Sequence, residues 1–369
     1  MPVVSLPSLR RYAIARSLFR PRPLARALDA FGFVQADPIR APARAQDLTL
    51  RHRVLGYRAG DLERRYRGLG IEEDFFVNYG FLTRDLHARL HPRGGVGAWP
   101  RPGRKVAEAV LAFVQERGEV HPRDVDAHFA HGAVTNYWGG SSSATTHVLD
   151  HLHYRGLLRV AGRDAGIRRY AARDVVAAPV VAAPVAGAAG RRACQDAIVD
   201  AAVALYSPLP SATLAWLVNR LRLATPQWRA EAPAMLARAK ARLAHARVGG
   251  LDWYWPAEEL PAGEVPDDRV ALLAPFDPVV WDRRRFEAFW DWRYRFEAYT
   301  PGAKRVFGYY AMPMLWREQI VGWANLSVSD GRLVAACGYV SGRPPRDRAF
   351  ARALEAELAA MRVFLGVAG

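Results

Sequence analysis

The chain of 369 residues has little cysteine, little lysine and no long apolar run. Its two cysteines, Cys194 and Cys337, are too few and too far apart for a disulfide framework or a thiolate metal site. We therefore expect the protein to be located in the reducing cytoplasm. The longest uncharged stretch, 175–190, is short and contains two prolines, and the N-terminus reaches Arg10 without an apolar signal core. We therefore expect no membrane segment.

Positive charge is abundant, and it is almost all arginine. The net charge is +16, while lysine occurs only at Lys105, Lys240 and Lys304. Residues 1–70 contain fourteen arginines against five carboxylates. A basic surface of this kind indicates a polyanionic partner, most simply nucleic acid.

The length exceeds that of a usual single domain, and the composition is typical of a globular protein with large cores. We expect an α+β chain that is mostly helical. Glycine and proline clusters, together with changes in composition, suggest a division into four domains and a linker. These are an N-terminal winged-helix-like domain (1–93), a winged helix (104–173), a linker (174–190), a third winged-helix-like domain (191–262) and a β-rich C-terminal domain with a closing helix (263–369).

The second of these domains has the clearest pattern. Helical spacing over 104–116, 121–131 and 141–154 is followed by two short strands at 157–160 and 167–170, which is the winged-helix order. Such domains present the helix before the hairpin to DNA. We therefore predict phosphate contacts from polar and basic residues of this helix and of the wing, namely Ser142, Thr145, Arg163, Arg168 and Arg169. The alternative is a winged helix that only packs against its neighbours.

Helices are predicted elsewhere from apolar periodicity and capping residues, over 5–19, 23–31, 42–54, 61–67, 83–90, 192–205, 211–221, 226–245 and 347–365. Extended segments are predicted from aromatic and β-branched content, over 74–82, 251–255, 307–315, 320–327 and 333–339. The segment 251–255 would be the reduced wing of the third domain.

A short polar motif follows the second predicted helix. Gln35 and Asp37 lie two residues apart, so an extended backbone points both side chains to the same face. Pro38 favours extended geometry at Asp37 and removes one amide donor. An amide that orients water, beside a carboxylate that accepts a proton or faces a developing cation, suits hydrolysis without a metal. Arg40 and Arg44 flank the pair as candidate DNA contacts; the alternative is a polar turn between two helices.

The sequence contains two other clusters of polar residues that could form a site. His147, His151 and His153 lie close together, but no further ligand except Asp150 is nearby in the sequence, so no metal site is predicted there. The three carboxylates of 72–74 precede an aromatic segment, where a helix start or a solvated turn is the simplest interpretation. A place in the cleft for one of them stays open.

Several motifs, taken together and in order, resemble the AlkZ-like winged-helix DNA glycosylases, which remove alkylated bases and unhook interstrand crosslinks in DNA repair. The resemblance covers nearly the whole chain. It is carried by the segments 33–39, 71–80, 152–156, 273–284, 293–297, 299–301 and 304–310.

The resemblance implies tandem winged helices followed by a small β-barrel, in a C shape around a DNA channel. The catalytic signature of the family is Gln-x-Gln or Gln-x-Asp, and Gln35 and Asp37 match the second form, which implies the crosslink-processing branch. The family also directs a β-hairpin toward DNA; 314–319 is our candidate for its tip, with Arg317 as a DNA contact.

The implied activity is hydrolysis of the N-glycosidic bond of N7-alkylated purines in double-stranded DNA, including crosslinked purines. No cofactor or metal is implied, and we expect a monomer. No lysine lies near the motif in the sequence, so a monofunctional enzyme that leaves an abasic site is expected. The competing hypothesis is a non-catalytic winged-helix regulator that retains the scaffold.

Overall fold

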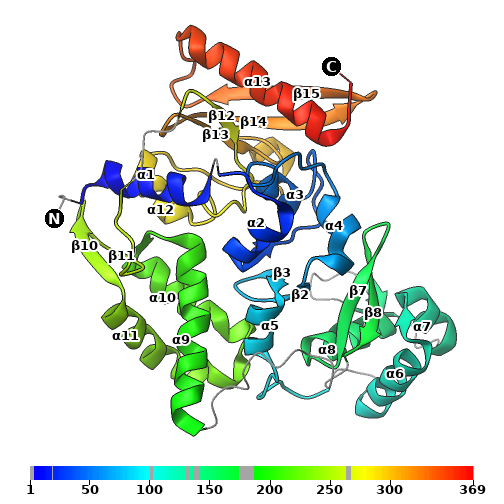
Figure 1. The fold of residues 1–369 in the computed structure, drawn as a ribbon. Helices are drawn as coiled ribbons and strands as arrows, with labels where there is room; N and C mark the ends of the chain where they lie inside the picture. Colours follow the sequence, from blue (N-terminus) through cyan, green and yellow to red (C-terminus); the bar gives the residue numbers. More distant parts are fainter. Residues whose placement is uncertain are drawn as a thin grey trace. The chain divides into compact units, whose positions relative to one another are not determined.

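The structure, a computed structural model, describes residues 4–18, 20–99, 103–129, 133–135, 141–173, 187–262 and 267–368. The chain forms two compact units, each built from more than one segment (Figure 1). Unit 1 comprises Met1–Leu62, Val199–Val218 and Ala234–Gly369, and unit 2 comprises Glu63–Ile198 and Asn219–Pro233. This division is coarser than the five predicted segments and does not test them.

The N-terminal part of unit 1 follows the local signals in the sequence. Helix α1 (Leu6–Ser17) begins at a capping box in which Ser5 accepts from the Ser8 amide. Helix α2 (Leu24–Phe31) ends at Gly32, whose positive φ of 66° turns the chain into strand β1 (Phe33–Gln35). Both helices were predicted within one or two residues. The next helix, α3 (Ala45–Leu50), is shorter than the predicted 42–54.

Unit 1 also contains the small sheet β9–β11 and parts of α4, α9, α10 and α11, whose other residues belong to unit 2. The hairpin of β10 and β11 turns at Gly249 and Gly250, which both have positive φ, and β11 also pairs with β9. The predicted strand at 251–255 is thus confirmed. The bounds are α4 Asp61–Arg65, α9 Gly187–Tyr206, β9 Leu209–Pro210, α10 Ser211–Arg220, α11 Ala232–Arg242, β10 Ala244–Val248 and β11 Leu251–Trp255.

The C-terminal sheet of unit 1 is open, with the order β12-β13-β14-β15, whereas a small barrel was expected. Its edge strand β12 does not pair with β15, because helix α13 lies against it (Figure 1). Glu357 of α13 accepts a hydrogen bond of 2.9 Å from the Leu272 amide and so satisfies an edge donor that barrel closure would have used. The bounds are β12 Val270–Leu272, α12 Arg283–Trp290, η4 Gly302–Lys304, β13 Met312–Trp316, β14 Gln319–Ser329, β15 Arg332–Tyr339 and α13 Arg348–Leu365.

Unit 2 contains the predicted order of three helices and a hairpin. Its elements are η1 Tyr66–Gly68, β2 Ile71–Phe75, β3 Tyr79–Thr83, α5 Arg84–Leu90, α6 Arg104–Arg117, β4 Glu119–Val120, α7 Pro122–Phe129, β5 Ala133–Thr135, β6 Ser141–Ser143, α8 Ala144–Tyr154, β7 Leu158–Asp164, β8 Ile167–Ala172, η2 Leu221–Leu223 and η3 Pro226–Glu231. Residues 141–143 form a strand rather than the predicted start of a helix. Most of the predicted linker 174–190 lies outside the described residues, and α9 begins at Gly187.

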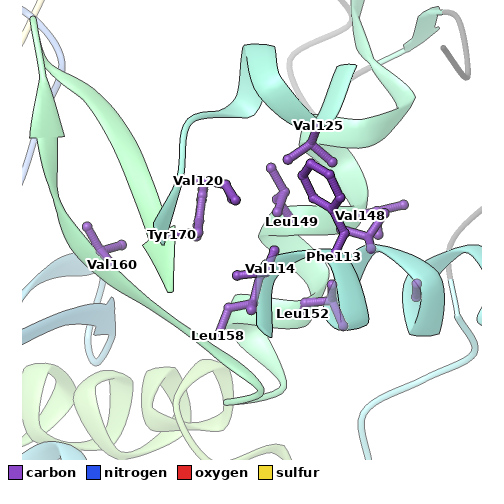
Figure 2. Packing of buried hydrophobic residues seen from close by; sticks show 12 residues of the cluster. Phe113, Val114, Val120, Val125, Val148, Leu149, Leu152, Leu158, Val160 and Tyr170 are labelled. Atoms are coloured by element: carbon purple, nitrogen blue, oxygen red, sulfur yellow. The ribbon is translucent and has the colours of Figure 1, made fainter. Parts of the chain in front are cut away.

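The core of α6, α8 and the β7–β8 hairpin is mostly aliphatic, with two buried aromatic rings, Phe113 and Tyr170. Val114, Leu149, Leu152 and Leu158 are fully buried, and Tyr170 of β8 packs beside them (Figure 2). These residues recur at helical spacing in α6 and α8 and alternate in β7, which is the pattern that the sequence predicted.

Unit 1 is held together by an ion pair between distant segments. Arg53, after α3, donates two hydrogen bonds of 2.7 and 2.9 Å to the carboxylate of Asp277, and both side chains are almost completely buried. Arg53 also donates to the carbonyls of Ser17 and Thr49, and Asp277 accepts from the Val279 amide. Every strong polar group of the pair therefore has a partner, as buried charges require. No helix in the described part of the chain is long and apolar enough to cross a membrane.

The Asp277→Asn variant should lower the free energy of unfolding by about 3–5 kcal/mol, because it leaves the Arg53 guanidinium buried beside a neutral amide. The matched control is Asp200→Asn, which breaks the half-exposed pair with Arg242 and should cost less than about 1 kcal/mol. Urea denaturation followed by tryptophan fluorescence measures both. Equal shifts in the two midpoints would contradict the structural importance of the buried pair.

Candidate active site

The Gln-Ala-Asp motif lies at the end of β1 in unit 1. Phe33 and Val34 are buried and hold the strand against the core, whereas Gln35 and Asp37 are half-buried. The polar pair therefore stays partly accessible on a segment whose apolar side chains are fixed. That the side chains of Gln35 and Asp37 point to the same face stays a prediction.

Hydrogen bonds set the backbone and the carboxylate of Asp37. Its Oδ1 accepts from the Ile39 amide at 2.9 Å, so the carboxylate caps the turn made at Pro38. Its own amide donates to Oε1 of Gln46 at 3.4 Å, and Gln46 lies on the buried helix α3. One carboxylate oxygen is thus tied to the backbone, and the position of the residue is tied to the core.

Burial raises the pKa of Asp37, although the hydrogen bond from Ile39 opposes this effect. Two tyrosines lie near its charge. Burial and, secondly, the charge of Asp37 raise the pKa of both Tyr299 and Tyr310. Within the described part of the chain no arginine or lysine forms an ion pair with Asp37, so its carboxylate is available to a water or to a cation.

Tyr310 lies within range of the charge of Asp37, which no local motif indicated. It is buried, and among the described residues its hydroxyl has no hydrogen-bond partner. An unpaired buried donor is costly unless a ligand or water satisfies it. The segment 304–310 stood out in the sequence, but nothing local to it indicated a position near Asp37.

The two arginines that flank the motif differ in exposure. Arg40 is exposed, and Arg44 is half-buried at the N-cap of α3. Arg317 lies at the turn between β13 and β14, where a hairpin tip was predicted, and it contacts the carboxylates of Asp268 and Asp347. Its charge is therefore largely neutralised within unit 1.

The basic residues of the predicted wing also have intramolecular partners. Arg163 holds Glu73 with two hydrogen bonds of 2.6 and 2.9 Å, Arg168 lies 3.0 Å from Asp150, and Arg169 lies 2.7 Å from Glu119. Thr145 was predicted to contact DNA, but its side chain is fully buried in the protein interior and is not accessible to DNA. Ser142 lies in β6, and its side chain is outside the described residues.

The carboxylates at 72–74 are neither a helix start nor a solvated turn. They lie in β2 and are buried, and each has a basic partner in unit 2. Arg159 contacts Glu72 at 2.9 Å, and Arg93 donates to Asp74 at 2.8 Å. Sequence reasoning missed this network because the partners are up to 90 positions apart.

Asp74, His87 and His91 form the one group of possible metal ligands in the described residues, with ligand atoms within 4.8 Å of one another. Both histidine Nε2 atoms, however, lie 3.1 and 2.8 Å from the same Asp74 oxygen, which is hydrogen-bond geometry. The guanidinium of Arg93 lies on the other oxygen. Burial alone would raise the pKa of Asp74, but these hydrogen bonds and this charge hold it well below its usual value. The group therefore fits a hydrogen-bonded ion pair better than a cation site.

The family model of the DNA glycosylase AlkZ-like proteins matches residues 28–364. This chain belongs to the AlkZ-like DNA glycosylase family. Membership makes it a DNA glycosylase, and the matched region includes residues Gln35 to Asp37.

A solved structure of the DNA glycosylase AlkZ from Streptomyces sahachiroi is similar to this chain, with a TM-score of 0.62 and 16% sequence identity. The similarity covers 99% of this chain and 97% of that chain. At this identity the likeness shows the fold, and the α+β architecture is therefore that of the AlkZ structure.

The histidine network of unit 2 should make stability depend on pH. Burial lowers the pKa of His87 to about 3 and that of His91 to about 4, whereas an unfolded histidine titrates near 6.5. The unfolded chain binds more protons between these values. The free energy of unfolding should therefore be highest above about pH 6.5 and fall toward pH 4, by up to about 1.4 kcal/mol per pH unit for each histidine.

Urea denaturation between pH 7.5 and 4.5 measures this slope. The His87→Gln variant should reduce it, while the exposed His245→Gln control should not. An unchanged slope in His87→Gln would show that another group carries the pH dependence.

Proposed function

We propose that this chain is a monofunctional DNA glycosylase that hydrolyses the N-glycosidic bond of N7-alkylated purines, unhooks interstrand crosslinks and leaves abasic sites. The observation that carries the proposal is Asp37, a half-buried carboxylate with a raised pKa and no ion-pair partner among the described residues, in the Gln-x-Asp form of the AlkZ-like signature.

The proposed reaction does not require a metal ion. N7 alkylation places a positive charge on the purine, which weakens the glycosidic bond and lets the base leave without strong acid assistance. The developing sugar cation then needs a nearby negative charge and a positioned water. In our proposal the free oxygen of Asp37 accepts the proton of that water and stabilises the cation, while Gln35 orients the water.

Contacts to DNA are also part of the proposal. Arg40 is exposed directly after the Asp37–Ile39 turn and suits a phosphate near the reacting sugar. The helices α6–α8 and the β7–β8 hairpin support a winged helix, although the ion pairs of Arg163, Arg168 and Arg169 indicate that this wing uses much of its charge internally. Arg44 and Arg317 remain candidate contacts. The chain is proposed to act as a monomer.

The substrate class is tested with duplex DNA containing N7-methylguanine, compared with unmodified DNA and with a nitrogen-mustard crosslink. We expect release of the modified base, separated strands from the crosslink, and an abasic site. Borohydride should trap no covalent protein–DNA adduct, because water and not an amine attacks the sugar. A chain that binds these duplexes and releases nothing would be a non-catalytic DNA-binding protein, and a trapped adduct would contradict the monofunctional mechanism.

The pH dependence of base release should follow ionisation of Asp37. Only the carboxylate accepts a proton, and burial raises its pKa above the usual aspartate value of about 3.9. The single-turnover rate should therefore be lost as the pH falls through this raised pKa and should level off above it. A rate that increases on acidification would instead indicate a protonated group as the catalyst.

The contribution of Gln35 is tested by Gln35→Ala. Removal of an oriented amide should lower the single-turnover rate by about 10²-fold with little change in DNA affinity, because the side chain acts on the water and not on the duplex. The control Gln227→Ala changes a glutamine of unit 2, far along the chain from the motif. Equal losses in the two variants would remove Gln35 from the proposed mechanism.

A further inference from the structure

Unit 1 contains a hollow of about 340 Å³ between the beginning of α10 and the beginning of α12. It is distinct from the Gln-Ala-Asp motif, and none of its residues belongs to the predicted site. Its size is in the range of pockets that hold small organic ligands, roughly 300–1,000 Å³. Its lining combines aromatic, acidic and basic side chains: Ala212, Thr213, Trp216, Trp281, Asp282, Arg283 and Arg284.

Two tryptophans form the aromatic wall. Trp281 stacks on the buried Tyr206, with centroids 4.4 Å apart and planes 24° apart. Trp216 meets Trp281 edge to face at 5.2 Å and is 45% exposed. The inner ring is therefore fixed by packing, while the outer ring still offers apolar surface to the hollow. A planar ligand would cover that surface and gain stacking energy.

The polar groups of the hollow are equally fixed. Asp282 is 8% exposed; it accepts from the Thr213 hydroxyl and, at 3.0 Å, from the Arg284 amide. These bonds leave acceptor capacity on a carboxylate that cannot turn away. The side chain of Arg284 is exposed, and in the described part of the chain it has no ion-pair partner. The hollow thus has a stacking face, an oriented acceptor and a cation at its rim.

The hollow has a neighbour in common with Asp37. Arg283, one of its lining residues, lies close enough to Tyr310 for its positive charge to lower the pKa of that hydroxyl. The charge of Asp37 raises the pKa of the same Tyr310. All of these residues belong to unit 1, and Tyr310 lies within range of the charges of both Arg283 and Asp37.

We propose that this hollow binds a nucleobase that has left the stack of the DNA, placed against Trp216 and Trp281. Asp282 accepts a hydrogen bond from an exocyclic amine, as carboxylates do at cytosine, and Arg284 contacts an adjacent phosphate. Stacking on aromatic side chains suits any base, and the energy it supplies offsets the cost of unstacking. The proposal rests on the DNA-binding part of the proposed function.

Photocrosslinking with the native chain of 369 residues tests the proposal directly. Duplexes with 5-iodocytosine, which keeps the exocyclic amine, at the position opposite the lesion, at a flanking position or in a single-stranded region are irradiated with the protein, and labelled peptides are mapped by mass spectrometry. We expect an adduct on Trp216 or Trp281, and the position that gives it identifies which base enters. Adducts found only on residues outside the hollow would overturn the proposal.

Variants provide a second measurement. Trp216→Ala should weaken binding to the duplex that crosslinks by about tenfold, whereas Trp216→Phe, which keeps an aromatic face, should retain most of the affinity. The exposed Leu260→Ala, with 67% exposure, is the control for lost apolar surface. An affinity of Trp216→Ala equal to that of the native chain would contradict the stacking role. If this variant does not fold, the adducts mapped on the native protein decide the question instead.

The charge at the rim is tested by salt dependence. Arg284→Gln should reduce the slope of log affinity against log salt by about 1, as expected for one lost phosphate contact, while the exposed Arg352→Gln on α13 should leave the slope unchanged. Base release without an adduct in the hollow would defeat this inference alone. An adduct without base release would defeat the proposed catalytic function alone.

Discussion

The buried pair of Arg53 and Asp277 is the interaction on which the arrangement of unit 1 depends. It joins two residues 224 positions apart, with bidentate hydrogen bonds in a site that excludes water. Arg53 fixes the end of the segment that contains α3, and α3 supplies Gln46 to the amide of Asp37. Asp277 fixes the turn that leads through Trp281 to α12. The same ion pair therefore helps to position the Gln-Ala-Asp motif and the wall of the aromatic hollow.

Charge in this protein is used inside the fold as well as on its surface. In unit 2, the strand β2 buries Glu72, Glu73 and Asp74, and arginines from distant elements neutralise them. Removing one member of such a pair leaves an uncompensated charge, so these arginines cannot be counted as free phosphate contacts. The excess of +16 is consequently presented by fewer exposed arginines, such as Arg40 and Arg284, than the composition suggests.

Local signals in the sequence predicted the elements that depend on local physics. The Ser5 cap placed α1, Gly32 ended α2, and the Asp347 cap placed α13. The family resemblance, confirmed by the family model, was equally accessible because it rests on ordered motifs. The open C-terminal sheet was not predicted, because it depends on a side chain of α13 that satisfies the edge of β12. The buried position of Thr145 and the position of Tyr310 near the charge of Asp37 depend on packing between separate elements. The periodicity of apolar residues along the sequence does not predict such packing.

The central claim is that the Asp37 carboxylate carries out the hydrolysis. The most direct measurement is the single-turnover rate of N7-methylguanine release by the native chain and by Asp37→Asn, with duplex affinity measured in parallel. Because the amide keeps the shape of the side chain and cannot take a proton, we expect normal binding and a rate at least about 10²-fold lower. Base release at the native rate by Asp37→Asn would contradict the account.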